Sequence, residues 1–189
     1  MTTIVAVKKE KRICIASDTL TLFGERKEIA EKHVYDEGKI LQIGNNFIGI
    51  AGHSSWSLVF KHYFSKKKRI TTWETVDQVF EVFNTLHRHL KDLYYLDPSY
   101  SRYEPLESSE FDLIIANSNG IFEVDYLRVV RQYHSFSAIG TGEEYALGAI
   151  KALYSSLDDV EEIAKMGIEA AAQFDRKTAL PLRVHCFDV

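Results

Sequence analysis

The chain has 189 residues, which is enough for one domain with a continuous hydrophobic core. Hydrophobic residues make up 46% and charged residues 26%, the balance of a folded globular protein and not of a disordered one. The formal net charge of −4 argues against a broad nucleic-acid surface, and the sequence has neither an apolar stretch of membrane-spanning length nor a signal-peptide pattern. We therefore expect a single cytoplasmic domain, residues 1–189, that binds neither nucleic acid nor membranes.

The first half of the chain predicts two β-hairpins and then two helices. The strands are apolar and β-branched, and the second hairpin turns through Gly44-Asn45-Asn46, residue types that tolerate positive φ. The second helix shows apolar residues at intervals of three and four, and Asp97-Pro98 stops it. The expected elements are strands at 3–7, 13–17, 39–43 and 47–52, and helices at 54–64 and 76–97.

The second half repeats this order of strands and helices. The pattern predicts a third hairpin, a single long strand, two helices and a closing strand. In chain order these are strands at 111–116, 121–125 and 132–140, helices at 143–156 and 158–174, and a strand at 180–187. Separate hairpins and helix pairs favour two antiparallel sheets stacked face to face, each covered on its outer face by a helix pair. The predicted fold class is α+β, a four-layer αββα sandwich.

Two cysteines, Cys14 and Cys186, lie inside predicted strands. In a chain without an export signal we expect them to be buried thiols and not a disulfide or a metal site. The chain carries no nucleotide-binding motif. Neither a metal nor an organic cofactor is expected.

Thr2 is the first residue that suggests chemistry. Because its side chain is small, we expect Met1 to be removed, which leaves a threonine with a hydroxyl and a free α-amine. That amine has an ordinary pKa of about 7.7–8.0, so it is partly neutral near physiological pH and can act as a general base for the hydroxyl. Asp18 closes the second strand and Lys39 begins the third, and a lysine held by an aspartate would lower the pKa values of both groups on Thr2.

Each of these residues also has an ordinary explanation. Thr2 can be a plain first residue, Asp18 a turn residue and Lys39 a solvated charge. Gly52, in "IAGHSSW", can be a turn glycine, or its unobstructed backbone N–H can stabilise a tetrahedral oxyanion at a strand–helix junction. The joint order of the four residues favours catalysis.

Several short motifs then occur in a characteristic order. They are "TTIV", "ASD", a glycine six residues after that aspartate, "KI…IAG", and "AIGTG" followed by "YA". Together they cover nearly the whole chain and resemble the proteasome β-type family, whose HslV-like members are N-terminal threonine peptidases of the Ntn-hydrolase superfamily. A bacterial homologue of the proteasome outside HslV proper is the second placement that the resemblance allows.

The resemblance implies roles for residues of this chain. Thr2 would be both nucleophile and base, supported by Asp18 and Lys39, with the oxyanion-hole N–H from Gly52. The stretch between Asp18 and Lys39 is longer than in the family, so Lys32 is a second candidate for the lysine, although "KIL" favours Lys39.

Three further positions carry over with changes. A family serine falls on Thr141, and an Asp–Ser element falls on Asp175 and Thr178. Threonine keeps the hydroxyl but adds a methyl group and stiffens χ1. The resemblance implies that the Thr141 hydroxyl hydrogen-bonds near the N-terminal amine and helps to relay protons there, and that Asp175 and Thr178 belong to the same catalytic site.

The resemblance also implies a substrate and an assembly. Thr21, Leu41 and Ile50 would line the pocket for the residue before the cleaved bond, which predicts a preference for apolar residues there. Peptides or unfolded proteins would be cleaved inside a homo-oligomer of stacked hexameric or heptameric rings. Any ATPase unfoldase would be a separate protein.

Other functions stay open on the sequence. The chain can be a non-catalytic ring subunit, although it lacks the extra N-terminal helix of such scaffolds, or an N-terminal nucleophile amidase that acts on a small amide. A Ser-His-Asp triad is disfavoured because no GxSxG elbow is present.

Overall fold

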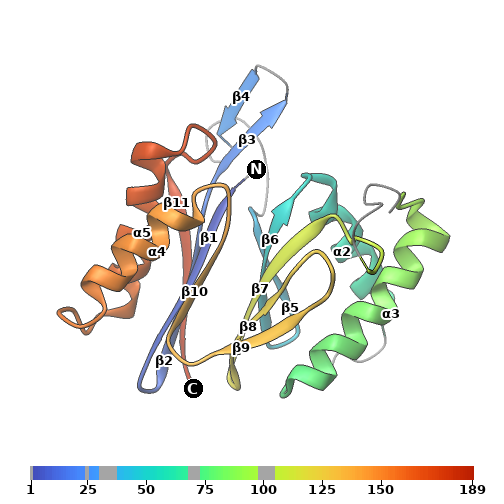
Figure 1. Ribbon diagram of the computed structural model, residues 1–189, viewed down its shortest axis with the longest axis horizontal. Coiled ribbons are helices and arrows are strands. Elements are labelled where there is room, and N and C mark those ends of the chain that lie inside the picture. The colour runs from blue at the N-terminus through green and yellow to red at the C-terminus, as the bar shows by residue number, and fades with distance from the viewer. Residues whose placement is uncertain (1, 24–25, 30–37, 68–72, 98–104) are drawn as a thin grey trace.

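A computed structural model describes residues 2–23, 26–29, 38–67, 73–97 and 105–189. Met1 and Lys32 lie outside the described residues. Two antiparallel sheets stand face to face in the middle of the molecule, with one helix pair on each side (Figure 1). The predicted αββα sandwich is therefore confirmed.

The first sheet carries both the beginning and the end of the chain. Its strand order is β10-β1-β2-β11, with every neighbouring pair antiparallel. The strands are β1 (Thr3–Lys9), β2 (Arg12–Asp18), β10 (Phe136–Gly140) and β11 (Leu182–Asp188). The central strand β1 is apolar at successive positions because both of its faces are buried: Ile4 and Ala6 face the other sheet, and Val5 packs toward the helices.

The second sheet is built from the two other predicted hairpins. Its order is β5-β6-β7-β8-β9, and all its neighbouring strands are antiparallel. The strands are β5 (Ile40–Ile43), β6 (Asn46–Gly52), β7 (Phe111–Asn117), β8 (Gly120–Val124) and β9 (Val130–Tyr133). Gly44 turns the first of these hairpins with φ +60°, as the sequence predicts.

The helices cover the two outer faces (Figure 1). They are α2 (Ser55–Ser65) and α3 (Val76–Tyr94) over the second sheet, and α4 (Glu143–Leu153) and α5 (Val160–Phe174) over the first. Three apolar clusters result, one under each helix pair and one between the sheets. Within the part of the chain that is described, no helix is both long and apolar enough to cross a bilayer.

The single strand predicted at 132–140 is wrong. The chain forms β9, which pairs with β8, and then β10, which pairs with β1 in the opposite sheet. The chain crosses between the sheets at His134-Ser135. Both halves are β-type in composition, so the local pattern cannot reveal the change of sheet.

A short hairpin was not predicted. Strands β3 (Leu20–Phe23) and β4 (Arg26–Ile29) pair as a separate two-stranded sheet directly after β2. It stands at the end of the first sheet where the N-terminus lies (Figure 1).

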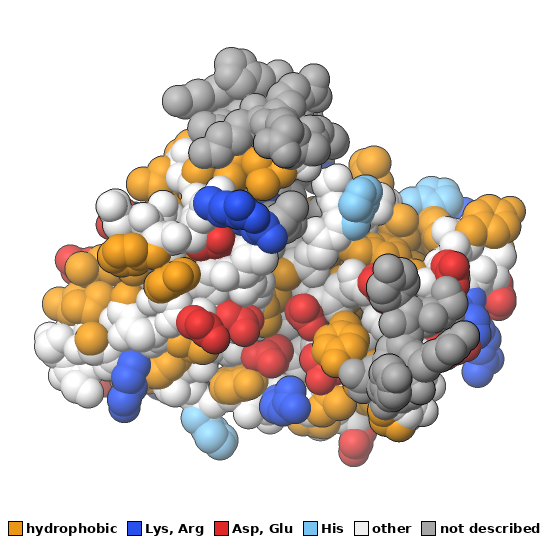
Figure 2. Space-filling view, turned by 45° about the horizontal axis from the view of Figure 1, so that its top comes forward, with side chains coloured by type: hydrophobic (Ala, Val, Ile, Leu, Met, Phe, Trp, Pro, Cys, Tyr) orange, Lys and Arg blue, Asp and Glu red, His pale blue; other side chains and the backbone are white. Residues whose placement is uncertain are grey.

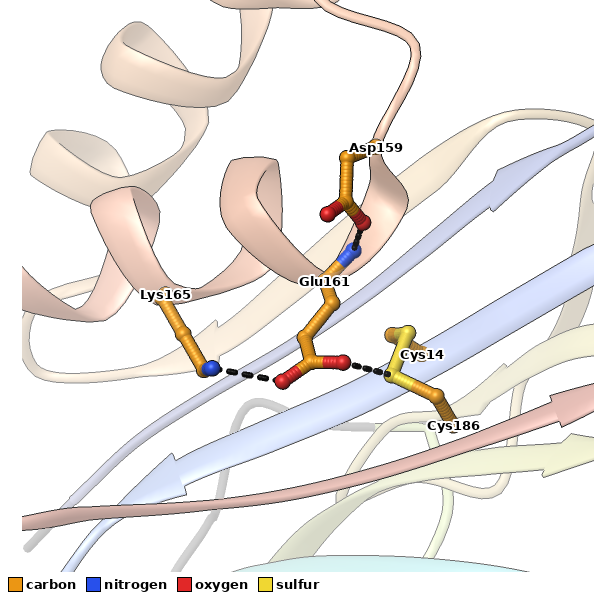
Figure 3. Close-up of a disulfide and its surroundings, with 5 residues drawn as sticks. All are labelled: Cys14, Asp159, Glu161, Lys165 and Cys186. Atoms are coloured by element: carbon orange, nitrogen blue, oxygen red, sulfur yellow. Dashed lines mark hydrogen bonds and ion pairs between the residues drawn. A yellow bond between two sulfur atoms is a disulfide. The ribbon is translucent and has the colours of Figure 1, made fainter.

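The expectation of two free thiols is also wrong. Cys14 on β2 lies directly opposite Cys186 on β11, with their Cα atoms 4.1 Å apart, and the two form a disulfide. Figure 3 shows this bond beneath α5, where the Glu161 carboxylate lies between the sulfur of Cys186 and the ammonium of Lys165. The two cysteines pair because the register of β2 with β11 sets them opposite each other. Neither strand's own sequence reveals that register, so the disulfide could not be predicted from the local pattern.

Candidate active site

A buried carboxylate organises the residues at the start of the chain. Asp18 ends β2 and its side chain is 0% exposed. Its Oδ1 accepts a hydrogen bond from the Thr2 hydroxyl at 2.8 Å and another from the Lys39 ammonium at 2.7 Å. A single oxygen atom thus holds both the hydroxyl and the cation.

The remaining donors around Asp18 come from the backbone. The N–H of Thr3 reaches Oδ1 at 3.0 Å, and the N–H groups of Leu20 and Ala179 reach Oδ2 at 3.0 and 3.4 Å. Burying a charge is costly unless it is paired and hydrogen-bonded, and here both conditions are met. Because the Lys39 side chain is only 14% exposed, water screens its ion pair with Asp18 weakly.

The strand register explains why these residues meet. Antiparallel pairing sets Ile4 opposite Ser17, so the residues before Ile4 lie beside the end of β2. Lys39 comes from the second sheet, directly before β5, where its carbonyl accepts the N–H of Ile50 at 3.1 Å. The site therefore spans both sheets at one end of the sandwich.

A second polar cluster forms around Asp175, the residue that follows α5. Its Oδ2 accepts hydrogen bonds from the hydroxyls of Thr141 at 2.6 Å and Thr178 at 2.7 Å, and its Oδ1 accepts the N–H of Lys177 at 3.1 Å. Partial burial opposes ionisation, but the bonds from Thr141 and Thr178 outweigh it and hold the pKa of Asp175 below its ordinary value of 3.8. The three residues that the sequence placed in one group are therefore in contact.

Two contacts join the clusters. The N–H of Thr141 donates to the carbonyl of Thr2 at 2.9 Å, and the hydroxyls of Thr3 and Thr178 lie 2.6 Å apart. Gly140 permits the first contact, because it has φ +96° and a Cβ atom there would stand 2.1 Å from the Thr2 carbonyl oxygen.

Gly52 ends β6 in the opposite sheet, with φ +152°. A side chain at this position would come within 3.0 Å of both the Glu110 carbonyl oxygen and the ring of Trp56. The Trp56 indole donates to that same carbonyl at 3.1 Å, so the start of α2 is fixed beside Gly52.

The three expected pocket residues fall into two places. Leu41 and Ile50 are buried on the helix-facing side of the second sheet, as diagonal neighbours in the β5–β6 pair, and belong to one apolar cluster with Trp56. Thr21 is half-buried on β3, in the separate hairpin. Across the described ranges, no group of His, Cys, Asp and Glu side chains is arranged to hold a metal ion.

Sequence reasoning missed Thr3 and the amide donors of Leu20 and Ala179. The doubled threonine of "TTIV" was a signal for Thr3, but its partner Thr178 lies 175 positions later. The two amides carry no side-chain signal at all.

Comparisons with known proteins agree on one family. The model of the proteasome subunit family matches residues 1–184. The ATP-dependent protease subunit HslV of Caldicellulosiruptor saccharolyticus is 32% identical over 178 residues, which are 90% of this chain and 89% of that protein.

Solved structures give the same result. BPH of Thiobacillus denitrificans, a bacterial proteasome homologue, is 38% identical over 98% of this chain. Its structure in complex with epoxomicin has a TM-score of 0.91 with 98% of that chain covered, and a second BPH structure has 0.92 with 97% covered. Eukaryotic HslV of Trypanosoma brucei shares the fold, with a TM-score of 0.66 and 19% identity over 99% of both chains. The chain belongs to the proteasome subunit family.

Proposed function

We propose that this chain is a threonine endopeptidase of a self-compartmentalised ring protease, and that Thr2 is its nucleophile. The observation that carries the proposal is the shared oxygen of Asp18, which accepts from the Thr2 hydroxyl at 2.8 Å and from the Lys39 ammonium at 2.7 Å. A hydroxyl alone is a weak nucleophile, and a nearby desolvated cation favours its ionised form.

Proton transfer completes the reaction. Removal of Met1 frees the α-amine of Thr2, which takes the hydroxyl proton as the oxygen attacks the peptide carbonyl. The ammonium then gives this proton to the leaving nitrogen, so that the C–N bond breaks and an ester to Thr2 remains. Water, deprotonated by the same amine, attacks the ester; its proton returns to the Thr2 oxygen, and the carboxylic acid product leaves.

The other predicted residues support this scheme. The N–H of Gly52 stabilises the tetrahedral oxyanion; Gly52 ends β6, and Trp56 and the Glu110 carbonyl pack where its side chain would be, which fixes this part of the backbone. Thr141 helps to relay protons beside the amine, and its hydroxyl, like that of Thr178, is held by the Asp175 carboxylate, which accepts a hydrogen bond from each.

The substrates are peptides or unfolded proteins. Leu41, Ile50 and Thr21 are assigned to the pocket for the residue before the cleaved bond; Leu41 and Ile50 are aliphatic, although both are buried on the helix-facing side of the second sheet. Apolar residues at that position are therefore preferred.

Assembly into stacked rings of six or seven copies belongs to the same proposal, as does a cytoplasmic location. Exposed apolar residues favour association: the rings of Tyr145 and Phe174 contact each other although these residues are 46% and 68% exposed. Figure 2 shows apolar side chains gathered over the end of the molecule that α4 and α5 form. The HslV relative is called ATP-dependent, and a separate ATPase is the corresponding partner here.

Peptide cleavage tests the proposal. Fluorogenic peptides with apolar, acidic or basic residues before the scissile bond are incubated with the wild type, with Thr2→Ala and with Thr85→Ala, which removes an exposed threonine on α3. We expect Thr2→Ala to lose activity on the order of 1,000-fold or more and Thr85→Ala to lose none. Full activity in Thr2→Ala would assign catalysis elsewhere, and no activity in the wild type would favour a scaffold subunit.

A further inference from the structure

Thr3 contacts both polar clusters of the site, yet its side chain takes no part in the proton transfers at Thr2. The residue is fully buried. Its N–H donates to Asp18 Oδ1 at 3.0 Å, and its Oγ1 lies 2.6 Å from the Oγ1 of Thr178. The peptide group between Thr2 and Thr3 is also held from its other side, because the Thr2 carbonyl accepts the N–H of Thr141 at 2.9 Å.

The direction of the hydroxyl contact can be deduced. A threonine hydroxyl has one proton to donate, and Thr178 donates its proton to Asp175 Oδ2 at 2.7 Å. Thr178 must therefore accept in its contact with Thr3, so the Thr3 hydroxyl is the donor. The result is a directed chain from Thr3 through Thr178 to the Asp175 carboxylate, and bonds in such chains strengthen one another.

Gly142 provides a second, independent observation. This residue has φ −101°, a value that any residue adopts, so backbone conformation does not require glycine there. The lack of space requires glycine instead, because an added Cβ would stand 2.3 Å from the Thr3 hydroxyl oxygen and 3.2 Å from that of Thr178. The absent side chain at Gly142 leaves room for the Thr3–Thr178 contact. The same Cβ would also press on Ala171, at 2.9 Å.

We propose that Thr3 is a positioning residue, whose hydroxyl ties the peptide that follows the nucleophile to Thr178 and thereby fixes how Thr2 presents its hydroxyl and amine. The inference rests on the proposed function of Thr2. Thr3 does not touch the substrate in this scheme. It acts through Thr2 and Thr178, so its loss changes the rate of the chemical step and leaves substrate binding intact.

The test compares Thr3→Val, which keeps the shape and removes the hydroxyl, with Thr3→Ser, which keeps the hydroxyl. For Thr3→Val we expect kcat to fall about tenfold with KM unchanged within about twofold, and for Thr3→Ser we expect at least half of the wild-type kcat. In a Thr178→Val background, Thr3→Val should cost nothing further, because the partner hydroxyl is already gone. Thr3→Ala repeats the measurement if Thr3→Val does not fold.

Ser17→Ala is the matched control. It removes a buried hydroxyl from the adjacent strand, one that has no hydrogen-bond partner among the described residues, and it should leave kcat and KM unchanged. A Thr3→Val protein with wild-type kcat overturns the positioning role. A kcat that falls equally in Thr3→Ser overturns it too, as does a fall in kcat from Thr3→Val that adds fully to the fall from Thr178→Val in the double variant. Peptidase activity in the wild type shows that such a failure concerns Thr3 alone. A wild type that neither cleaves peptides nor reacts with epoxomicin overturns this inference together with the proposed function.

Discussion

Asp18 gathers more hydrogen-bond donors than any other side chain described at this site, and all of them reach a carboxylate with no access to water. Among them, Lys39 supplies the compensating charge. The Lys39–Asp18 ion pair therefore supports both the stability of the fold and the proposed chemistry, so its removal should change both the free energy of unfolding and the rate of peptide cleavage.

We predict that Lys39→Met, which keeps most of the length of the side chain, lowers the free energy of unfolding by about 3 kcal/mol, because it leaves the Asp18 charge buried without a cation. It should also abolish peptide cleavage. Urea unfolding and the peptide assay measure the two effects. Lys151→Met, at an exposed position on α4, is the control. If Lys39→Met and Lys151→Met lost equally little free energy of unfolding, the role of the ion pair would be contradicted.

The contact among Thr2, Asp18 and Lys39 was predicted from the sequence, because both the chemistry of these residue types and their order along the chain indicated it. The position of Thr3 was not predictable in the same way. Its significance comes from Thr178, which reaches the site only because the loop before β11 returns to the start of β1.

Among the elements, the strands and helices with strong local patterns were predicted well, and the errors arose where tertiary structure decides. The 132–140 segment divides between two sheets, and nothing in its local composition marks the crossing. The Cys14–Cys186 disulfide likewise depends on the register between β2 and β11, which are distant in sequence.

The disulfide closes a long loop, since its cysteines are 172 residues apart. Constraining so large a part of the unfolded chain favours the folded state, so we predict that reduction lowers the free energy of unfolding by about 2–5 kcal/mol. Guanidinium unfolding with and without a reductant measures this. Cys14→Ala/Cys186→Ala should be insensitive to the reductant, and a wild type equally insensitive would contradict the prediction.

A buried histidine ties α3 to the segment before β7. His87 contacts the Ser109 hydroxyl at 2.9 Å and the Glu107 carboxylate at 3.3 Å, while Arg128 donates to the carbonyl of Glu107 at 2.7 Å and to Ser109 at 2.9 Å. Lys91 pairs with Glu107 from the next turn of the helix. Burial, and then the charge of Arg128, lower the pKa of His87 below 6.5, against the opposing effect of Glu107.

Because the folded pKa of His87 lies below its unfolded value, the unfolded chain binds a proton that the folded chain does not. Stability from this group is therefore complete above pH 6.5 and falls as the pH drops from 6.5 toward the folded pKa. We predict that the loss of unfolding free energy between pH 7.5 and 5.5 is smaller in His87→Asn than in the wild type. A pH dependence in His87→Asn identical to that of the wild type would contradict the assignment.

At the scale of the whole molecule, the exposed apolar surface on α4 and α5 predicts self-association. Native mass spectrometry should find the wild type as stacked rings of six or seven copies, and Thr2→Ala should assemble equally, because Thr2 is buried within its own subunit. Replacing Tyr145 and Phe174 by Glu should reduce the assembled fraction. A wild type that is monomeric at all concentrations would contradict the ring.

In the proposed mechanism, the free amino terminus of Thr2 serves as the base for the hydroxyl of the same residue. Mass spectrometry of the active wild type, intact and after reaction with epoxomicin and digestion, tests this most directly. We predict a chain that begins at Thr2 and an adduct on the peptide that contains Thr2, with no adduct in Thr2→Ala. An active protein that retains Met1 would contradict it, because the nitrogen of Thr2 would then be an amide, which cannot act as a base. An adduct on any other residue would contradict it as well, because the nucleophile would then not be Thr2.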